Sequence, residues 1–420
     1  MTTTEVAEHP AAAADSGLRG YLQVAKTPGM PAWTTVVICQ RLPVAMSPLA
    51  LVYLGKVAAN SYSIGAVLAG ANALAEAATA GVAGRRFDRN SPRDEVQLVL
   101  VLQALMLLTL AIPTLFDSKS LPIWAMLLLA AGAGGVASGA HGGLRALLVR
   151  TVDRSAHHAA LSLESTLTTL VWAVGPGIVG LVVLFADKAW PLLVCGVLAL
   201  CGVFAADALT ETHPPEDADA TRVRVLRLSW PAPFQEAAVL VCVGAAYTGL
   251  PTLLDKLGTD AGVAGPVLAG FAVAGILGGL IYGSRNWPGS YRHQSTALVL
   301  VIIGLIGAAV VMPTAIGVIV LMTVSGLVGT PALAARAAGL QELLPERAWA
   351  TGFSGLYAAG GVGFGAAGLI VAALLGPAGI RTALLACVAL AAAAAIVGAF
   401  GEERLIARTP LPSSNAEYHS

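Results

Sequence analysis

The stretch Gly84-Arg85-Arg86-Phe87-Asp88-Arg89-Asn90-Ser91-Pro92-Arg93 decides the fold, because it is a dense run of charge between two long apolar segments. Charge is scarce elsewhere: 11% of the 420 residues are Asp, Glu, Lys or Arg, whereas soluble domains have about 25%. The hydrophobic fraction is 56%. A soluble chain could not cover its surface with so few charges, so residues 84–93 are predicted to form a loop at a membrane surface.

Twelve apolar runs are long enough to cross a bilayer. A crossing needs about 20 residues, and backbone groups in lipid must be satisfied within the segment, so each run is predicted to be an α-helix. The chain is therefore predicted to be an all-α integral membrane protein with twelve transmembrane helices, in the plasma (inner) membrane. The predicted spans are 34–55, 62–84, 95–116, 121–144, 157–185, 188–209, 234–254, 263–284, 295–313, 315–337, 348–375 and 379–400.

The longest polar interruption divides the spans into two groups of six. A short repeat supports two related halves: Val67-Leu68-Ala69-Gly70 recurs as Val267-Leu268-Ala269-Gly270, at the same place in each half. Parallel repeats of this kind are a known transporter architecture. The predicted organisation is a cytoplasmic tail at 1–32, a six-helix bundle at 33–209, a cytoplasmic linker at 210–233, a second six-helix bundle at 234–402 and a cytoplasmic tail at 403–420.

Basic residues predict the orientation, since cytoplasmic loops carry an excess of Lys and Arg. Of the 24 basic residues, Arg41 lies inside the first span. With the amino terminus inside, most of the others fall on the cytoplasmic side. The exceptions on the outer side are Lys56, Lys119, Lys188, Lys256 and Arg381. The alternation holds through all the spans, so both termini are predicted to be cytoplasmic.

The charged segment resembles the loop between helices two and three of the major facilitator superfamily, which reads approximately G-x-x-x-D-[RK]-x-G-[RK]-[RK]. Gly84, Asp88, Arg89 and Arg93 match that pattern, whereas Ser91 replaces its second glycine. The resemblance covers about residues 33–402 and implies alternating access by a monomer that carries a small-molecule substrate. It also implies that this gating loop latches the two halves together in the outward-open state. Its arginines suit anionic membrane lipids as well.

Charges inside the spans are costly and indicate function. The candidates for the coupling and substrate site are Arg41, Glu76, Arg145 and Glu164, with Asn72 on the same helix face as Glu76. Two roles stay open for Glu76: it carries a coupling proton, or it forms a structural pair with Arg41 or Arg145. For Glu164 we expect pairing with Arg145 or Arg154. In the second half, Glu236, Arg336 and Glu342 lie near span ends.

A glycine–proline segment is predicted to interrupt the fifth span. Gly175, Pro176 and Gly180 permit a kink and close helix approach. The segment is similar to part of the antiporter motif of drug-exporting facilitators, near G-P-x-x-G-G, but the glycine doublet is missing. The arginine that those exporters carry in the middle of the fourth span is also missing before Arg145.

Several function classes lack their motifs. The sequence has no P-loop, no G-x-S-x-G elbow and no H-E-x-x-H, so we expect neither an enzyme nor ATP-driven transport. A net charge of zero argues against nucleic acid as a partner, and we expect no metal and no cofactor.

The remaining pattern favours a proton-coupled exporter of a small drug-like or amphipathic metabolite. Few carboxamides lie in the spans, which argues against sugar uptake, and a mostly apolar cavity with carboxylates suits amphipathic or cationic compounds. An uptake permease, a uniporter for another small solute and a non-transporting membrane sensor or scaffold stay open as alternatives.

Overall fold

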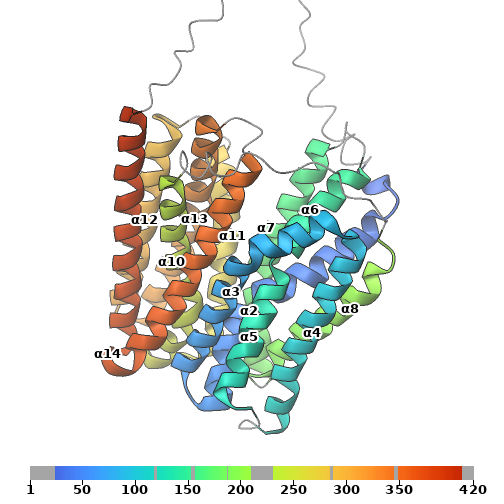
Figure 1. Ribbon diagram of the computed structural model, residues 1–420. Coiled ribbons are helices and arrows are strands. Elements are labelled where there is room, and N and C mark those ends of the chain that lie inside the picture. The colour runs from blue at the N-terminus through green and yellow to red at the C-terminus, as the bar shows by residue number, and fades with distance from the viewer. Residues whose placement is uncertain are drawn as a thin grey trace, which may run out of the picture.

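The computed structural model describes residues 24–117, 121–152, 157–186, 188–209, 230–283, 287–344 and 349–408, and the elements in these ranges are helices. Figure 1 shows two groups of helices side by side, α2–α8 and α10–α14; they are called the N-terminal and C-terminal halves. The N-terminal half contains α2 (Met30–Ala59), α3 (Tyr62–Arg89), α4 (Pro92–Phe116), α5 (Ile123–Ala137), α6 (Ala140–Thr151), α7 (His157–Phe185) and α8 (Trp190–Ala206). The C-terminal half contains α10 (Pro231–Lys256), the short 3-10 helix η2 (Ala261–Val263), α11 (Ala264–Gly283), α12 (Tyr291–Val311), α13 (Ala315–Leu343) and α14 (Trp349–Arg408).

In the described ranges, nine helical segments are long and apolar enough to cross a membrane. One of them, 355–405, has 51 residues, which is more than twice the length that a single crossing needs. Gly379 has a φ of 78° inside it, a value that glycine adopts without strain, and Figure 1 shows α14 turning back on itself at its lower end. This segment therefore supplies two antiparallel helices. The count of twelve spans and the orientation of the termini stay predictions.

Two helices differ in extent from the predicted spans. α3 continues through the charged motif to Arg89, so only Asn90 and Ser91 separate it from α4. The predicted loop at 84–93 is mostly helix, because hydropathy marks where lipid contact ends rather than where the helix ends. Within the predicted span 121–144, the two turn residues Ser138 and Gly139 separate α5 from α6, although 123–145 still counts as one candidate span.

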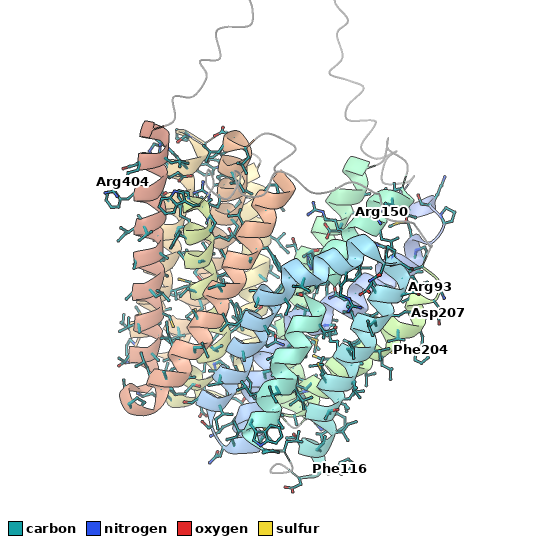
Figure 2. The ribbon with its side chains drawn as sticks, viewed as in Figure 1. Arg93, Phe116, Arg150, Phe204, Asp207 and Arg404 are labelled. Carbon is teal, nitrogen blue, oxygen red and sulfur yellow. The ribbon has the colours of Figure 1, made fainter. Side chains whose placement is uncertain are left out.

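The burial pattern fits a membrane solvent. The first helix of each half, α2 and α10, is the most enclosed: 78% of its apolar stretch is buried, against 33–44% for the other candidate spans. Large apolar side chains cover the outside, among them Leu105 (61% exposed) and Ile316 (75% exposed). Figure 2 shows Phe116 and Phe204 pointing outward in the same way. A surface of this kind is suited to hydrocarbon rather than water.

Small residues bring the two halves into direct contact. A Cβ atom on Gly368 of α14 would lie 2.8 Å from the carbonyl oxygen of Ala66 and 2.9 Å from Cα of Gly70, both in α3. Close approach through glycine is a common way to pack helices in lipid. Tyr53 adds a hydrogen bond from its hydroxyl to the carbonyl oxygen of Ala261, at 2.6 Å. These contacts involve the end of α2 and the start of α3, so they lie at the end of the molecule opposite the α3–α4 junction.

Candidate functional site

Five polar residues from three helices meet inside the N-terminal half: Arg41 of α2, His141 and Arg145 of α6, and Glu164 and Thr168 of α7. They are called the central cluster. Nη2 of Arg41 donates to Oε1 of Glu164 at 2.5 Å and to the carbonyl oxygen of His141 at 3.5 Å. Nη1 of Arg41 donates to Oγ1 of Thr168. Nε of Arg145 lies 3.7 Å from Oε2 of Glu164.

Burial separates the two arginines of the central cluster. The side chains of Arg41 and Glu164 are 2% and 5% exposed, whereas that of Arg145 is 56% exposed. A buried charge is tolerated only when it is paired and hydrogen-bonded, and Glu164 meets that need for Arg41. Glu164 was predicted to pair with Arg145 or Arg154. The structure shows the pair with Arg145 and a closer one with Arg41, while Arg154 lies outside the described residues.

Glu76 lies at the boundary between the halves. Its Oε1 accepts a hydrogen bond from the hydroxyl of Tyr357 in α14, at 2.7 Å. The ring of Tyr357 also faces the ring of His141, with centroids 5.8 Å apart, which connects the central cluster to the C-terminal half. The sequence offered Arg41 or Arg145 as structural partners for Glu76. In the structure both arginines pair with Glu164, and Glu76 bonds to Tyr357 instead.

Asn72, predicted for the same site, packs against α5. It is 5% exposed, and its Nδ2 donates to the carbonyl oxygen of Ala130 at 2.8 Å. The face of α3 that carries Asn72 and Glu76 therefore has two kinds of partner: Asn72 bonds to α5, and Glu76 bonds to α14. Thr79 binds the point where α5 ends, donating to the carbonyl oxygen of Gly135 at 2.8 Å and lying 3.1 Å from Oγ of Ser138. Hydroxyls at a break of this kind satisfy backbone groups that the interrupted helix leaves open.

Part of the gating motif can be placed at the α3–α4 junction. Nη2 of Arg93 contacts Oδ1 of Asp207 at 3.1 Å, which joins α4 to the end of α8; Figure 2 shows these two side chains together. Arg86 holds Glu95 through Nε at 3.1 Å and Nη2 at 3.0 Å. Arg86 lies beyond the predicted span 62–84. Its hydrogen bonding to Glu95 and the negative charge of Glu95 raise the pKa of its guanidinium group. Gly84 lies within α3, and the side chains of Asp88 and Arg89 lie outside the described part of the structure.

The glycine–proline segment does not interrupt its helix, as the sequence suggested it would, because α7 is continuous from His157 to Phe185. The small residues instead permit contact with α11 of the other half. A Cβ atom on Gly180 would lie 2.7 Å from Cα of Gly265, and one on Gly177 would lie 3.2 Å from Cβ of Ala269. Pro176 belongs to the same surface, since its carbonyl oxygen faces Gly265. The segment thus forms a packing surface between the halves.

A second polar network lies in the C-terminal half. Arg336 of α13 donates to Glu402 of α14 through Nη2 at 2.5 Å and Nη1 at 3.1 Å, and Nη1 also donates to Oε1 of Gln235 at 2.8 Å. Oγ of Ser295 donates to the same Gln235 oxygen at 3.0 Å. The sequence singled out Arg336 but missed Glu402 and Gln235. Glu402 lay beyond the last apolar run, where a charge is expected to be solvated.

Comparisons with known proteins agree with this architecture. Residues 33–317 match the model of the Major Facilitator Superfamily. A bacterial homologue of the human lysosomal transporter Spinster, in an inward-facing and occupied conformation, has a TM-score of 0.69 at 16% identity over 96% of this chain and 100% of its own. The nucleoside transporter NupG has a TM-score of 0.64 at 16% identity, covering 90% of this chain and 99% of its own.

A transporter of the POT family, in complex with a thioalcohol-conjugated peptide, has a TM-score of 0.71 at 10% identity, covering 91% and 99% of the two chains. At these identities, the structural likenesses establish the fold alone. Comparison with curated protein sequences finds no match. Within the described residues, no group of three or more His, Cys, Asp or Glu side chains is arranged to hold a metal ion.

Proposed function

Because the chain belongs to the Major Facilitator Superfamily, it is a multi-pass membrane transporter rather than an enzyme, and we propose that it is a proton-coupled secondary transporter working by alternating access. The proposal includes twelve spans in two six-helix halves, with both termini cytoplasmic, in the plasma membrane, and a monomeric working unit. Basic residues at the ends of the predicted spans support this orientation. In that orientation, the contacts of Gly368 and Tyr53 close the outer side.

The observation that carries the coupling proposal is the hydrogen bond between Glu76 and Tyr357 across the two halves. An ionised Glu76 is a stronger acceptor than a protonated one, so protonation weakens this contact. The groups near the contact are His141, which faces the Tyr357 ring, and the Arg41, Arg145 and Glu164 set beside His141. Binding or release of a proton at Glu76 would then shift the equilibrium between the two arrangements of the halves.

We propose that the gating motif closes the cytoplasmic side when the transporter is in its outward-open state. Two bonds support this role: that of Arg86 to Glu95 fixes the corner at which α3 and α4 join, and that of Arg93 to Asp207 ties α4 to the end of α8. Asp88 would then meet the C-terminal half when the cytoplasmic side closes. An Asp88→Asn variant should shift the transporter toward the inward-open state, and unchanged turnover and conformational populations would refute the latch.

Export of a small amphipathic metabolite in exchange for protons is the transport mode we propose. Gln40 and Asn72 both donate to carbonyl oxygens of α5, so these carboxamides are engaged in helix packing rather than available to a sugar. The glycine contacts of Gly180 with α11 support a packing surface across which the halves rearrange. An uptake permease or a uniporter is the second candidate, and the direction and proton dependence of flux separate them.

Reconstituted vesicles with an imposed pH gradient test the proposal. Solute flux and internal pH are followed for a panel of amphipathic ions, amino acids, nucleosides, short peptides and sugars. Glu76→Gln should abolish solute-driven proton movement while solute still equilibrates, and Tyr357→Phe should weaken coupling less severely. Glu403→Gln, an exposed carboxylate at the end of α14, is the matched control. Proton movement that survives unchanged in Glu76→Gln would overturn the coupling role.

A further inference from the structure

The central cluster has unequal charges. Among the described residues, Glu164 is the one carboxylate that forms an ion pair with Arg41 or Arg145. Within the described part of the chain, two guanidinium groups thus share a single carboxylate, and one positive charge has no ion-pair partner of its own. Glu76 accepts a hydrogen bond from Tyr357, and among the described residues no ion pair joins it to Arg41 or Arg145.

The excess charge is localised on Arg145. Glu164 is engaged with Arg41 at 2.5 Å, a short charge-assisted hydrogen bond. Its distance of 3.7 Å from Arg145 is beyond the range of about 2.7–3.2 Å for a hydrogen bond. The side chain of Arg145 is 56% exposed, so its donors are accessible. Arg145 is therefore positioned to bind an anionic group that comes from outside the fold.

Arg41 provides a second, independent observation. The residue is only 2% exposed, and its buried Nε has no hydrogen-bond partner. Unpartnered buried donors are uncommon in native structures, and each one calls for an explanation. An acceptor oxygen in the central cluster would satisfy this donor and lower the cost of burying the guanidinium.

The neighbouring surface is aromatic. The ring of Tyr357 is tilted by 32° to that of His141, with centroids 5.8 Å apart, and Tyr357 is 41% exposed. An organic body with a flat face can pack on an exposed ring, while its charged end reaches the arginine.

We propose that the central cluster binds the carboxylate of a small planar organic anion, with Arg145 as the main ligand and Arg41 behind it. The proposal rests on the transport function proposed above, and it names the substrate class of the same site. A guanidinium fork matches a carboxylate in geometry as well as in charge. The anion site replaces the preference for cationic compounds that the sequence suggested, because Glu164, the carboxylate of the central cluster, is already paired with Arg41.

Compounds that differ only in charge provide the test. Indole-3-acetate, indole-3-acetamide and tryptamine share one ring system and carry a negative, zero and positive charge. Phenylpropionate, its amide and phenylpropylamine make a second trio. Binding is measured by thermal stabilisation of the purified full-length protein. We expect each anion to bind about tenfold or more tighter than its amide, as a charge-assisted contact of about 1.5–3 kcal/mol implies.

Variants of the arginine distinguish a specific site from general charge attraction. Arg145→Gln should abolish the preference for the anion, whereas Arg145→Lys should keep part of it. Arg404→Gln, an exposed arginine at the end of α14, is the matched control and should keep the full preference. The proposal is overturned if neither anion binds more tightly than its amide and its amine, or if the preference persists in Arg145→Gln.

The outcomes separate this proposal from proton coupling. Proton-coupled transport of amines or neutral compounds that depends on Glu76 would overturn the anion site and keep the proposed function. Anion binding that depends on Arg145, with no proton movement in any vesicle experiment, would keep the anion site and overturn the coupling.

Discussion

Replacing Glu402 by alanine leaves the guanidinium of Arg336, a residue that is 1% exposed, without its carboxylate partner. The wild-type arginine donates to both carboxylate oxygens of Glu402, at 2.5 and 3.1 Å, and to Gln235 at 2.8 Å. The alanine variant keeps only the bond to Gln235. Loss of one partner from a buried ion pair typically costs about 3–5 kcal/mol, and we expect a fall of that size in the free energy of unfolding.

Two further variants divide that cost between its causes. Glu402→Gln retains an oxygen that can accept one bond but removes the charge, so its cost should be about 1.5–3 kcal/mol, the value of a hydrogen bond to a charged group. The double variant Arg336→Met/Glu402→Leu removes both charges. It also removes Nε of Arg336, a buried donor without a partner. We expect the double variant to recover most of the stability lost in Glu402→Ala.

Unfolding in mixed micelles, followed by the loss of helical signal with increasing denaturing detergent, measures these differences. Glu403→Ala is the matched control, because the neighbouring carboxylate is exposed. The reasoning is refuted if Glu402→Ala is no less stable than Glu403→Ala, or if the double variant is as unstable as the single one. Retained transport in the double variant would show that the pair acts on stability alone.

Two other substitutions test the contacts between helices. Gly368→Val would press on Ala66 and Gly70 and force α3 and α14 apart, so transport should be lost while the protein still inserts and folds. The control variant Gly376→Val should transport normally, because a Cβ atom there meets nothing within 4 Å. Equal activity of the two variants would contradict the role of this contact. Thr79→Val removes the hydrogen bond to Gly135 at the α5–α6 break and should lower the free energy of unfolding by about 0.5–1.5 kcal/mol, as measured in the same micelles. An unchanged midpoint would mean that the break does not need that hydroxyl.

The residues of the candidate site could be found from the sequence because charge is so rare in it. Arg41, Glu76 and Glu164 stood out inside apolar runs, where a charge needs a partner or a function. Family membership was also accessible, since the pattern around Asp88 and the alternation of basic loops are local features. These signals depend on residue type and spacing alone.

Partners could not be predicted in the same way. Glu76 and Tyr357 are 281 residues apart, so their contact depends on how the two halves meet. The break at Ser138–Gly139 was hidden for a different reason: 47 glycines are spread through the chain, and few of them end a helix. The burial of Glu402 could not be predicted either, because a charge after the last apolar run is expected to be solvated. Only the position of α13 beside it shows that it is buried.

The asymmetry of the polar groups has a mechanical consequence. The central cluster belongs entirely to the N-terminal half, and the C-terminal half contributes Tyr357 next to it through α14. That helix is also the one whose glycines press against α3 at Ala66 and Gly70. A movement that changes the α3–α14 contact must therefore change the bond between Tyr357 and Glu76 as well, because both lie on the same pair of helices. Proton binding and rearrangement of the halves would then be coupled without a separate relay between them.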